Sequence, residues 1–420
     1  MRKKLIIMSL DALGDIDSKI FEQLPGFRYL MENGSYIRRV KSVYPSLTYA
    51  CHASIITGRY PRDHGIVNNL LLQPSKEKMD WYWYEKNIEG DTLYRAAKRK
   101  GLKTGAVLWP VSAKGNIDYN VAEIIPHRPW HNQVIVSLLN SNPTLIYNLD
   151  KKYGHLRNGL SQPELDNFIE ACFHEILKTY SPDMMTAHFI AVDEYKHNYG
   201  INSEKIAEAI KTYDDRIRNT IELLKSKNEL ANTNLIVLSD HSHIDLKTGL
   251  RLNKFLFEKG YLKLKGGKIN KYDAIMHEAG GSCYIYSKSK DRKSLSKLRE
   301  DLEEFASQYG GIEAIYTACE AESLGADPEC VFMLEALSGY YFIQDINGDI
   351  VDDTLPHHKA THGYNPDKPD YSAVFFAVGP DFKNITIEDA NLVDIAPTIS
   401  KAMDLGLKGA SGRRLEEILL

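Results

Sequence analysis

The sequence predicts an α/β fold in which helices cover both faces of a largely parallel β-sheet, and three observations favour this class. Short apolar runs alternate along the chain with segments of helical periodicity. The 420 residues are 43% apolar and carry a formal net charge of −4, which suits one large domain with an insertion, or two domains. Acidic and histidine residues recur directly after the apolar runs, at the edge where parallel sheets bind ligands.

Five apolar runs have the length and composition of buried strands. They cover residues 4–10, 103–109, 184–192, 233–240 and 372–379. The first follows a charged start, as in a signal peptide, but it ends at Asp11 without a small-residue cleavage site. We therefore interpret it as the first strand. No stretch is long and apolar enough to cross a bilayer.

Segments with helical periodicity lie between these runs. They cover residues 17–34, 92–101, 163–180 and 203–227. In the last segment, apolar residues recur at helical spacing: Ile206, Ile210, Tyr213, Ile217 and Ile221. We expect this face to pack on the sheet.

Two regions look like additions to the core. Residues 111–160 combine Pro, His, Trp and Asn with poor periodicity, so we expect a lid or loop region there. Residues 265–355 contain their own candidate strands and a charged helix, which predicts a small inserted α+β subdomain. Residues 1–264 and 356–420 would then form the core.

Composition excludes several classes of protein. No basic excess points to nucleic acid or to an anionic membrane surface. The five cysteines are scattered, odd in number and without CxxC pairing, which argues against a disulfide framework or a cysteine zinc site. We expect small buried thiols and a cytoplasmic location.

Four groups of residues at the ends of predicted strands can carry chemistry. They are Asp11; Asp193 with His197; Asp240 with His241; and His362. Asp193 and His197 are four residues apart, which places both side chains on one face of a helical turn. His362 precedes a glycine, which allows the backbone to approach a neighbour closely.

Three Asp and three His divide naturally into two metal sites of three ligands each. Two metals about 4 Å apart suit in-line displacement at phosphorus. Each residue alone has a plainer interpretation, since a strand-end Asp often caps a helix or shapes a turn. A histidine inside a strand, such as His188, is more often a packed core residue. The joint occurrence at strand ends is what favours metal binding.

The stretch "YPSLTYACHASIITGRYPRDHGIVNN" (44–69) resembles the nucleophile segment of the nucleotide pyrophosphatase/phosphodiesterase family of the alkaline phosphatase superfamily. The likeness includes Thr48 after Tyr-Pro and two residues, the "HASIITG" run and "PRDHGI". It extends to Asp11, "DEYKHNYG", "SDHS", "THGYN" and the closing "NLVDIAPTISKAMDLGL", and it is weakest over 111–160 and 265–355. It implies an alkaline phosphatase-like core.

The resemblance also implies roles for single residues. Thr48 would be the nucleophile, and Asn69 would donate a hydrogen bond to a non-bridging phosphate oxygen, although "NN" also favours a turn. One zinc would be held by Asp193, His197 and His362. The other would be held by Asp11, Asp240, His241 and Thr48. The cofactor would be two Zn²⁺ per chain, while the ligands alone also admit Mn²⁺.

The implied activity is hydrolysis of phosphodiester or pyrophosphate bonds through a phospho-threonine intermediate, with a small, nucleotide-like phosphorylated substrate as partner. We expect neither a nucleic-acid scaffold nor a membrane as a partner, and the sequence does not specify the oligomeric state. Three aromatic residues are candidates for stacking on a base: Trp109, Trp130 and Tyr199.

Departures from the family pattern leave alternatives open. Leu47 stands where the family often has Lys, and Tyr49-Ala50 replaces Phe-Pro, so substrate contacts near Thr48 are expected to differ. The alternatives are a phosphonoacetate hydrolase and a phosphomonoesterase; the latter needs a cation that points inward, from Lys41, Arg59 or Arg62. A sulfatase is disfavoured because Cys51 lacks the required context. A binding protein with a dead site is disfavoured because Thr48 and all six ligands are present.

Overall fold

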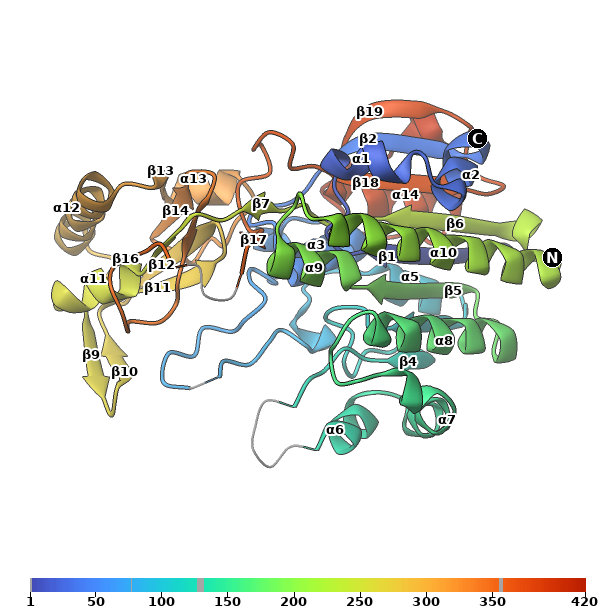
Figure 1. The fold of residues 1–420 in the computed structure, drawn as a ribbon, viewed down its shortest axis with the longest axis horizontal. Coiled ribbons are helices and arrows are strands. Elements are labelled where there is room, and N and C mark those ends of the chain that lie inside the picture. The colour runs from blue at the N-terminus through green and yellow to red at the C-terminus, as the bar shows by residue number, and fades with distance from the viewer. Residues whose placement is uncertain (1, 77, 127–131, 355–357) are drawn as a thin grey trace.

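The computed structural model describes residues 2–76, 78–126, 132–354 and 358–420. An eight-stranded sheet with the order β19-β2-β18-β6-β1-β5-β3-β4 forms its centre (Figure 1). Its strands are β1 (Lys4–Leu10), β2 (Ser35–Lys41), β3 (Thr104–Val107), β4 (Tyr119–Val121), β5 (Met184–Phe189), β6 (Thr233–Leu238), β18 (Ala373–Val378) and β19 (Thr386–Asn391). Only β18 runs antiparallel to its neighbours β2 and β6. The predicted α/β class with a largely parallel sheet is confirmed.

Helices cover both faces of this sheet. One face packs against α2 (Pro25–Asn33), α8 (Glu164–Thr179) and α10 (Glu204–Ser226) (Figure 1). The other packs against α3 (Thr48–Thr57), α5 (Leu93–Arg99) and α14 (Ile395–Ala402). Along β1, Leu5 and Ile7 face one layer while Ile6 and Met8 face the other, as the period of a strand requires. A strand buried on both faces explains why this run is continuously apolar.

Several predicted elements are confirmed, with shifts at their ends. The five apolar residues predicted to line one face of α10 are all buried. The run over 184–192 stops being a strand at Phe189, and α9 (Ala191–Tyr199) begins two residues later. The single helix expected over 17–34 is instead divided into α1 (Ser18–Phe21) and α2. Pro25 is the first residue of α2, where its missing N–H costs nothing.

The region expected as a lid or loop contains regular structure. It includes β4, α6 (Gln133–Asn140), α7 (Pro143–Tyr153) and the 3-10 turn η3 (Gly154–Leu156). Asn132 and Asn142 cap the two helices by accepting hydrogen bonds from backbone amides of the first turn. The short length of these elements hides their periodicity in the sequence.

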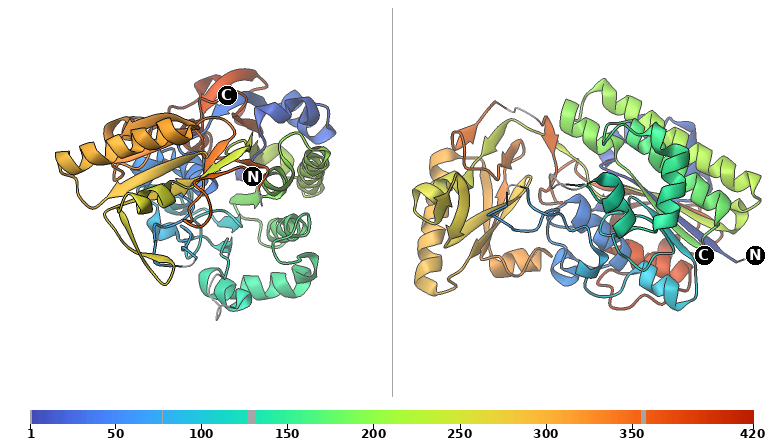
Figure 2. Two further views of the ribbon diagram at one scale, coloured as in Figure 1. Left: turned by 60° about the vertical axis from the view of Figure 1, so that its left-hand side comes forward. Right: turned by 90° about the horizontal axis from the view of Figure 1, so that it is seen from below.

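A smaller antiparallel sheet, ordered β11-β12-β14-β13, lies at the far end of the molecule from the N-terminus (Figures 1 and 2). Its elements are β11 (Ala274–Ala279), β12 (Ser282–Ser287), α12 (Arg292–Tyr309), β13 (Ile312–Thr317), α13 (Ala318–Ser323) and β14 (Phe332–Ala336). Its hydrophobic core also takes in side chains of α11 (Leu252–Glu258), before residue 265. The division at 265 and 355 stays a prediction.

The remaining elements are short. They are α4 (Pro61–His64), β7 (Ile244–Asp245), β8 (Thr248–Leu250), β9 (Leu262–Lys265), β10 (Lys268–Tyr272), β15 (Tyr340–Phe342), β16 (Val351–Asp352) and β17 (Ala360–Thr361), with 3-10 turns η1 (Asp15–Asp17), η2 (Glu85–Asn87), η4 (Leu230–Asn232), η5 (Leu392–Asp394) and η6 (Glu416–Ile418). Of these, β7 and β17 pair antiparallel and matter for the site.

All five cysteines are free thiols. Four are buried as expected, and Cys319 is exposed, contrary to expectation, on the short helix α13. Within the described ranges, no helix combines the length and apolar character needed to span a bilayer. The cytoplasmic location stays a prediction.

Candidate metal centre

The carboxyl ends of three adjacent parallel strands gather the acidic residues. β1 lies between β6 and β5 in the sheet. Asp11 directly follows β1, Asp240 lies two residues beyond β6, and Asp193 lies in the first turn of α9, which follows β5. Because parallel strands end at the same sheet edge, these carboxylates from distant parts of the sequence meet there.

The β7–β17 pair brings two histidines to the same place. Thr361 pairs with Ile244, so His362 and His243, which flank this pair, lie close together with ring centroids 5.1 Å apart. Gly363 has φ +86°, and a Cβ there would lie 1.8 Å from the Ala279 carbonyl oxygen. The close backbone approach predicted for the glycine after His362 is therefore confirmed.

The helix α3 positions the predicted nucleophile. Thr48 is its first residue, so the side chain lies at the positive end of the helix dipole. His52, one turn along, contacts the Thr48 carbonyl oxygen through Nδ1 (2.8 Å) and the Ser9 hydroxyl through Nε2 (2.9 Å). These contacts tie the start of α3 to β1.

Asp11, Asp240 and His241 form what we call the aspartate-rich cluster. His241 Nε2 lies 3.2 Å from Asp240 Oδ2 and 3.5 Å from Asp11 Oδ1. The hydroxyl of Thr48 is 3.1 Å from the same nitrogen. The second oxygen of each carboxylate is held by the protein: Asp240 Oδ1 accepts from the Ala12 amide, and Asp11 Oδ2 accepts from His188.

Asp193, His197, His243 and His362 form the histidine-rich cluster. The Nδ1–H groups of His197 and His362 donate to the carbonyls of Ala360 (2.8 Å) and Ser46 (3.0 Å). This leaves Nε2 of both rings as a free lone pair directed at Asp193, which is the usual arrangement of metal-binding histidines. The His241 and His362 rings stack with centroids 4.0 Å apart, so the two clusters are in direct contact.

Unpartnered buried atoms test whether these residues suit a metal. Asp11 Oδ1, Asp193 Oδ1 and Asp240 Oδ2 are buried without a hydrogen-bond partner among the described residues. Leaving such oxygens unpaired is costly unless a cation binds them. Carboxylate oxygens and imidazole nitrogens are also the ligands that zinc and manganese take. The residues therefore fit one divalent metal in each cluster.

The pKa values of the cluster residues also favour metal binding. Burial raises the pKa of Asp193 to about 7 and that of Asp240 to about 6. Burial and the charge of Asp240 raise the pKa of Asp11 well above its usual value. Burial lowers the pKa of His197 to about 4 and that of His362 to about 3, so both rings are in the neutral form that binds metals.

All six residues predicted as metal ligands, together with Thr48, thus meet at one sheet edge. Two histidines near them were not predicted to take part. His243 belongs to the histidine-rich cluster, and its spacing of two from His241 is a signal that the sequence does contain. His188 is a buried strand residue, as expected, but its Nε2 also lies 3.0 Å from Asp11 Oδ2.

His188 belongs to a buried polar chain behind Asp11. Its Nδ1 lies 3.7 Å from Glu123 Oε2, and Glu123 Oε1 accepts a hydrogen bond from the Tyr49 hydroxyl (3.0 Å). Burial lowers the pKa of His188, but the hydrogen bond with Asp11 and the nearby Glu123 carboxylate outweigh it and hold the pKa well above its usual value. The contact between His188 Nε2 and Asp11 Oδ2 fixes the orientation of the Asp11 carboxylate.

A cleft of about 400 Å³ opens beside His197 and His362. Asn69 and Trp81 line it, and the Trp81 ring packs against Tyr49 with centroids 5.1 Å apart. Of the aromatic residues predicted to stack on a base, Trp109 is fully buried and unavailable, and Tyr199 is 52% exposed on α9 outside this cleft. The third, Trp130, lies outside the described residues.

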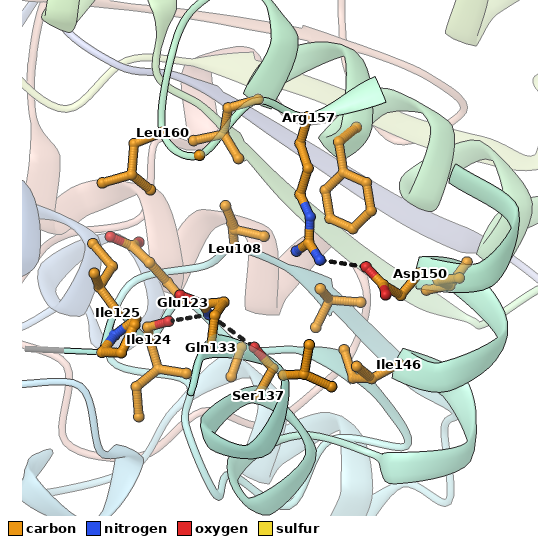
Figure 3. A pocket seen from close by; sticks show the side chains of 18 of the residues that line it. Leu108, Glu123, Ile124, Ile125, Gln133, Ser137, Ile146, Asp150, Arg157 and Leu160 are labelled. Atoms are coloured by element: carbon orange, nitrogen blue, oxygen red, sulfur yellow. Dashed lines mark hydrogen bonds and ion pairs between the residues drawn. The ribbon is translucent and has the colours of Figure 1, made fainter. Parts of the chain in front are cut away.

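A second, mainly apolar cavity of about 480 Å³ lies beyond Glu123 (Figure 3). Gln133 crosses its floor and donates to the Ile124 carbonyl and the Ser137 hydroxyl, while Arg157 pairs with Asp150 at the rim (Figure 3). None of the described residues that line it belongs to either cluster. We therefore place the chemistry at the cleft beside the clusters.

Comparison with known proteins gives a family match over most of the chain. The family model for type I phosphodiesterase/nucleotide pyrophosphatase matches residues 5–365. A human ectonucleotide pyrophosphatase/phosphodiesterase family member 1 is 29% identical over 253 residues, which is 57% of this chain and 24% of that protein. A Caenorhabditis elegans ectonucleotide pyrophosphatase/phosphodiesterase is 24% identical over 91% of this chain and 40% of that protein. The chain thus spans well under half the length of these relatives.

Solved structures of similar fold include murine ectonucleotide pyrophosphatase/phosphodiesterase 5, with a TM-score of 0.71, 20% identity and full coverage of both chains. The same murine protein has been solved as an inactive variant in complex with AMP, with the same TM-score, identity and coverage. This likeness confirms the fold.

Proposed function

The chain belongs to the type I phosphodiesterase/nucleotide pyrophosphatase family, and from this premise we propose that it hydrolyses phosphodiester or pyrophosphate bonds at two metal ions, with Thr48 as the nucleophile. The observation that carries the proposal is the position of the Thr48 hydroxyl. It lies 3.1 Å from His241 Nε2, at the N-terminus of α3, and directly follows Leu47, which lines the cleft.

The cluster residues and Thr48 have separate proposed roles. Asp11, Asp240 and His241 would hold one metal beside Thr48, and Asp193, His197 and His362 would hold the other. Zinc bound there supplies charge stabilisation and lowers the pKa of a neighbouring hydroxyl. Thr48 Oγ1 releases its proton to solvent and attacks phosphorus, and the P–O bond to the leaving group breaks with its electron pair on the leaving oxygen, which takes up a proton from water. Water then cleaves the phospho-threonine ester, which restores the threonine hydroxyl and releases the phosphorylated product.

Backbone and amide groups support the same step. The start of α3 has no side-chain cap at Leu47, so the positive end of its dipole can face an anion at Thr48. Asn69 Oδ1 accepts a hydrogen bond from the Tyr49 amide (2.9 Å), so its Nδ2 is oriented as a donor for a phosphate oxygen. Zinc fits the ligand set, and the same ligands admit manganese.

The charges around the nucleophile favour a diester over a monoester, which carries one more negative charge. The three cations that flank the motif are occupied elsewhere. Lys41 pairs with Asp367 (2.5 Å), Arg59 donates to the Gly409 carbonyl (2.9 Å) and Arg62 donates to the Glu322 carbonyl (2.5 Å). In the cleft, Arg251 is paired with Asp352 (2.7 Å). The three cations that flank Thr48 are therefore engaged away from the extra charge of a monoester.

A nucleotide-like substrate is supported by two observations. The cleft places the Trp81 ring, backed by Tyr49, near Asn69, where a planar base can stack. The murine relative of the same fold binds AMP. We propose a nucleoside phosphodiester or a nucleoside pyrophosphate as the substrate class.

Thr48→Ala tests the proposal. We expect turnover of a nitrophenyl phosphodiester to fall at least ~10³-fold, since a missing nucleophile removes the covalent step. Thr57→Ala is the matched control, because Thr57 is a buried threonine of the same helix whose hydroxyl donates to the Ala53 carbonyl and accepts from the Arg59 amide. Thr48→Ala with full turnover and bound metals would refute the nucleophile.

Comparing substrates separates the alternatives. We expect diesterase activity to exceed monoesterase activity and to disappear with a chelator. Dominant monoesterase activity would move the assignment to a phosphatase, and a metal-loaded protein silent on both substrates would point to phosphonates.

A further inference from the structure

The histidine-rich cluster contains one residue more than a three-ligand catalytic site. Resting on the proposed function, we propose that His243 Nε2 is a fourth protein ligand of the metal held by Asp193, His197 and His362. The aspartate-rich cluster has three such residues, so the two sites differ in kind.

His243 lies as close to the Asp193 carboxylate as His197 and His362 do. Asp193 Oδ1 lies 3.3 Å from His243 Nε2, against 3.6 Å from His197 Nε2 and 3.8 Å from His362 Nε2. The three nitrogens therefore surround one carboxylate oxygen, and His243 is the nearest of them. The His243 ring centroid lies 4.5 Å from that of His197 and 5.1 Å from that of His362.

The burial of the His243 ring favours binding of a cation by its nitrogen atoms. The residue is 1% exposed, and neither ring nitrogen has a hydrogen-bond partner among the described residues. Other buried histidines of the chain do have one: His52 Nε2 contacts Ser9 Oγ, and His64 Nε2 contacts Ser54 Oγ, both at 2.9 Å. A metal at Nε2 satisfies the nitrogen that faces Asp193, in a place where a packed core histidine would have a protein partner.

The backbone holds His243 in this position. It directly precedes β7, whose partner β17 directly precedes His362. The ladder that places His362 in the cluster therefore places His243 there as well, and neither ring depends on a long flexible loop.

Four protein ligands change what the site can do. Zinc sites with four protein ligands are closed and hold their metal strongly, whereas catalytic sites keep an open position. The site with Asp193 would then retain its metal most tightly. The aspartate-rich site has three such residues beside the Thr48 hydroxyl, which the proposed reaction needs, so we expect a chelator to remove its metal first.

Metal binding by His243→Gln tests the inference, measured by competition with a chromophoric chelator on the full chain. We expect one of two zinc sites to weaken by at least ~10–100-fold, the loss that removal of even an outer partner causes. In the cobalt-substituted protein, we expect the visible absorption bands to change in shape and intensity. His174→Gln is the control, because His174 is half-buried and contacts Thr220 (3.1 Å) between α8 and α10. Unchanged zinc affinities together with an unchanged cobalt spectrum would overturn the inference.

The wild-type chain provides a second measurement that does not depend on the variant folding. Loaded with one equivalent of zinc, its X-ray absorption spectrum should show three imidazole ligands. Two imidazoles, or one, would overturn the inference. A wild-type chain that binds no metal would instead refute the proposed function, so the two failures are distinguishable.

Discussion

The side-chain amide of Asn69 contacts the first turn of α3 and serves both the fold and the proposed chemistry. Its Oδ1 accepts from the Tyr49 amide, one of the N–H groups that have no partner within the helix. Its Nδ2 is then left for a phosphate oxygen. The neighbouring Asn68 differs, because both ends of its amide bind backbone: Nδ2 donates to the Glu278 carbonyl and Oδ1 accepts from the Leu70 amide.

Asn69→Asp separates these two roles. The aspartate keeps an acceptor for the Tyr49 amide, but replaces the donor with a negative charge facing the phosphate. We expect kcat to fall ~10²–10³-fold or more, the cost of losing one such donor. The melting temperature should stay close to that of the wild type, because an acidic group is favourable at a helix N-terminus. Activity assays and thermal unfolding measure the two effects.

Asn68→Ala is the control for this experiment. It loses two hydrogen bonds to backbone, so we expect reduced stability with kcat per folded molecule preserved. Full activity of Asn69→Asp would contradict the donor role and leave Asn69 as a helix cap alone.

The sequence identified most single residues of the site because strand ends mark them. His243 was not predicted, although its spacing of two from His241 can place both side chains on one side of an extended segment. The sequence also could not show that Lys41, Arg59 and Arg62 turn away from Thr48. Their partners, among them Asp367 and Glu322, are remote in sequence and become neighbours only through folding.

At the scale of elements, β14 is joined to the segment before α3 by a buried carboxyl. Glu335 is fully buried, and it accepts hydrogen bonds from the Tyr44 hydroxyl (2.8 Å) and the Asn365 amide (3.0 Å). Burial raises the pKa of the Glu335 carboxyl to about 7. The folded protein therefore binds a proton at this carboxyl more tightly than the unfolded chain does.

Glu335→Gln should change how stability depends on pH. Between the unfolded pKa, about 4.3, and about 7, the wild type loses stability as pH rises, because only the folded state still holds the proton. The loss is at most of the order of 3 kcal/mol. The glutamine variant lacks this slope, and its amide can still donate to Tyr44. We expect its unfolding free energy, relative to the wild type, to increase from pH 5 to pH 8 in urea titrations.

Parallel curves for wild type and variant over this range would contradict the prediction. The measurement is made on metal-free protein, so that the cluster carboxylates titrate equally in both chains and cancel in the difference.

For the whole molecule, the sequence predicts the α/β class because buried parallel strands are continuously apolar. It also predicts the sheet edge that carries the site, because the acidic and histidine residues directly follow these strands. The structure of region 111–160 does not follow from the sequence, because α6 and α7 are short and depend on asparagine caps rather than on periodicity. The core around α11 and the smaller sheet is also hard to foresee, since its members come from both sides of residue 265.

The clusters draw their ligands from segments spread across the whole chain, from Asp11 to His362, so bound metals would cross-link the fold. A ligand that binds only the folded state stabilises it by about 4 kcal/mol per site when its concentration is 1,000 times its Kd. We therefore expect a chelator to lower the melting temperature substantially. The double variant Asp240→Asn/His362→Gln should be insensitive to the chelator.

This metal effect should itself depend on pH. The pKa of Asp193 is raised to about 7 and that of Asp240 to about 6 in the metal-free protein, so protons compete with the metal below neutral pH. The difference in melting temperature between metal-loaded and metal-free protein should be largest above pH 7 and should shrink steadily towards pH 5. Differential scanning calorimetry at each pH measures it. A difference that stays constant from pH 8 to pH 5 would show that these carboxylates do not bind the metal.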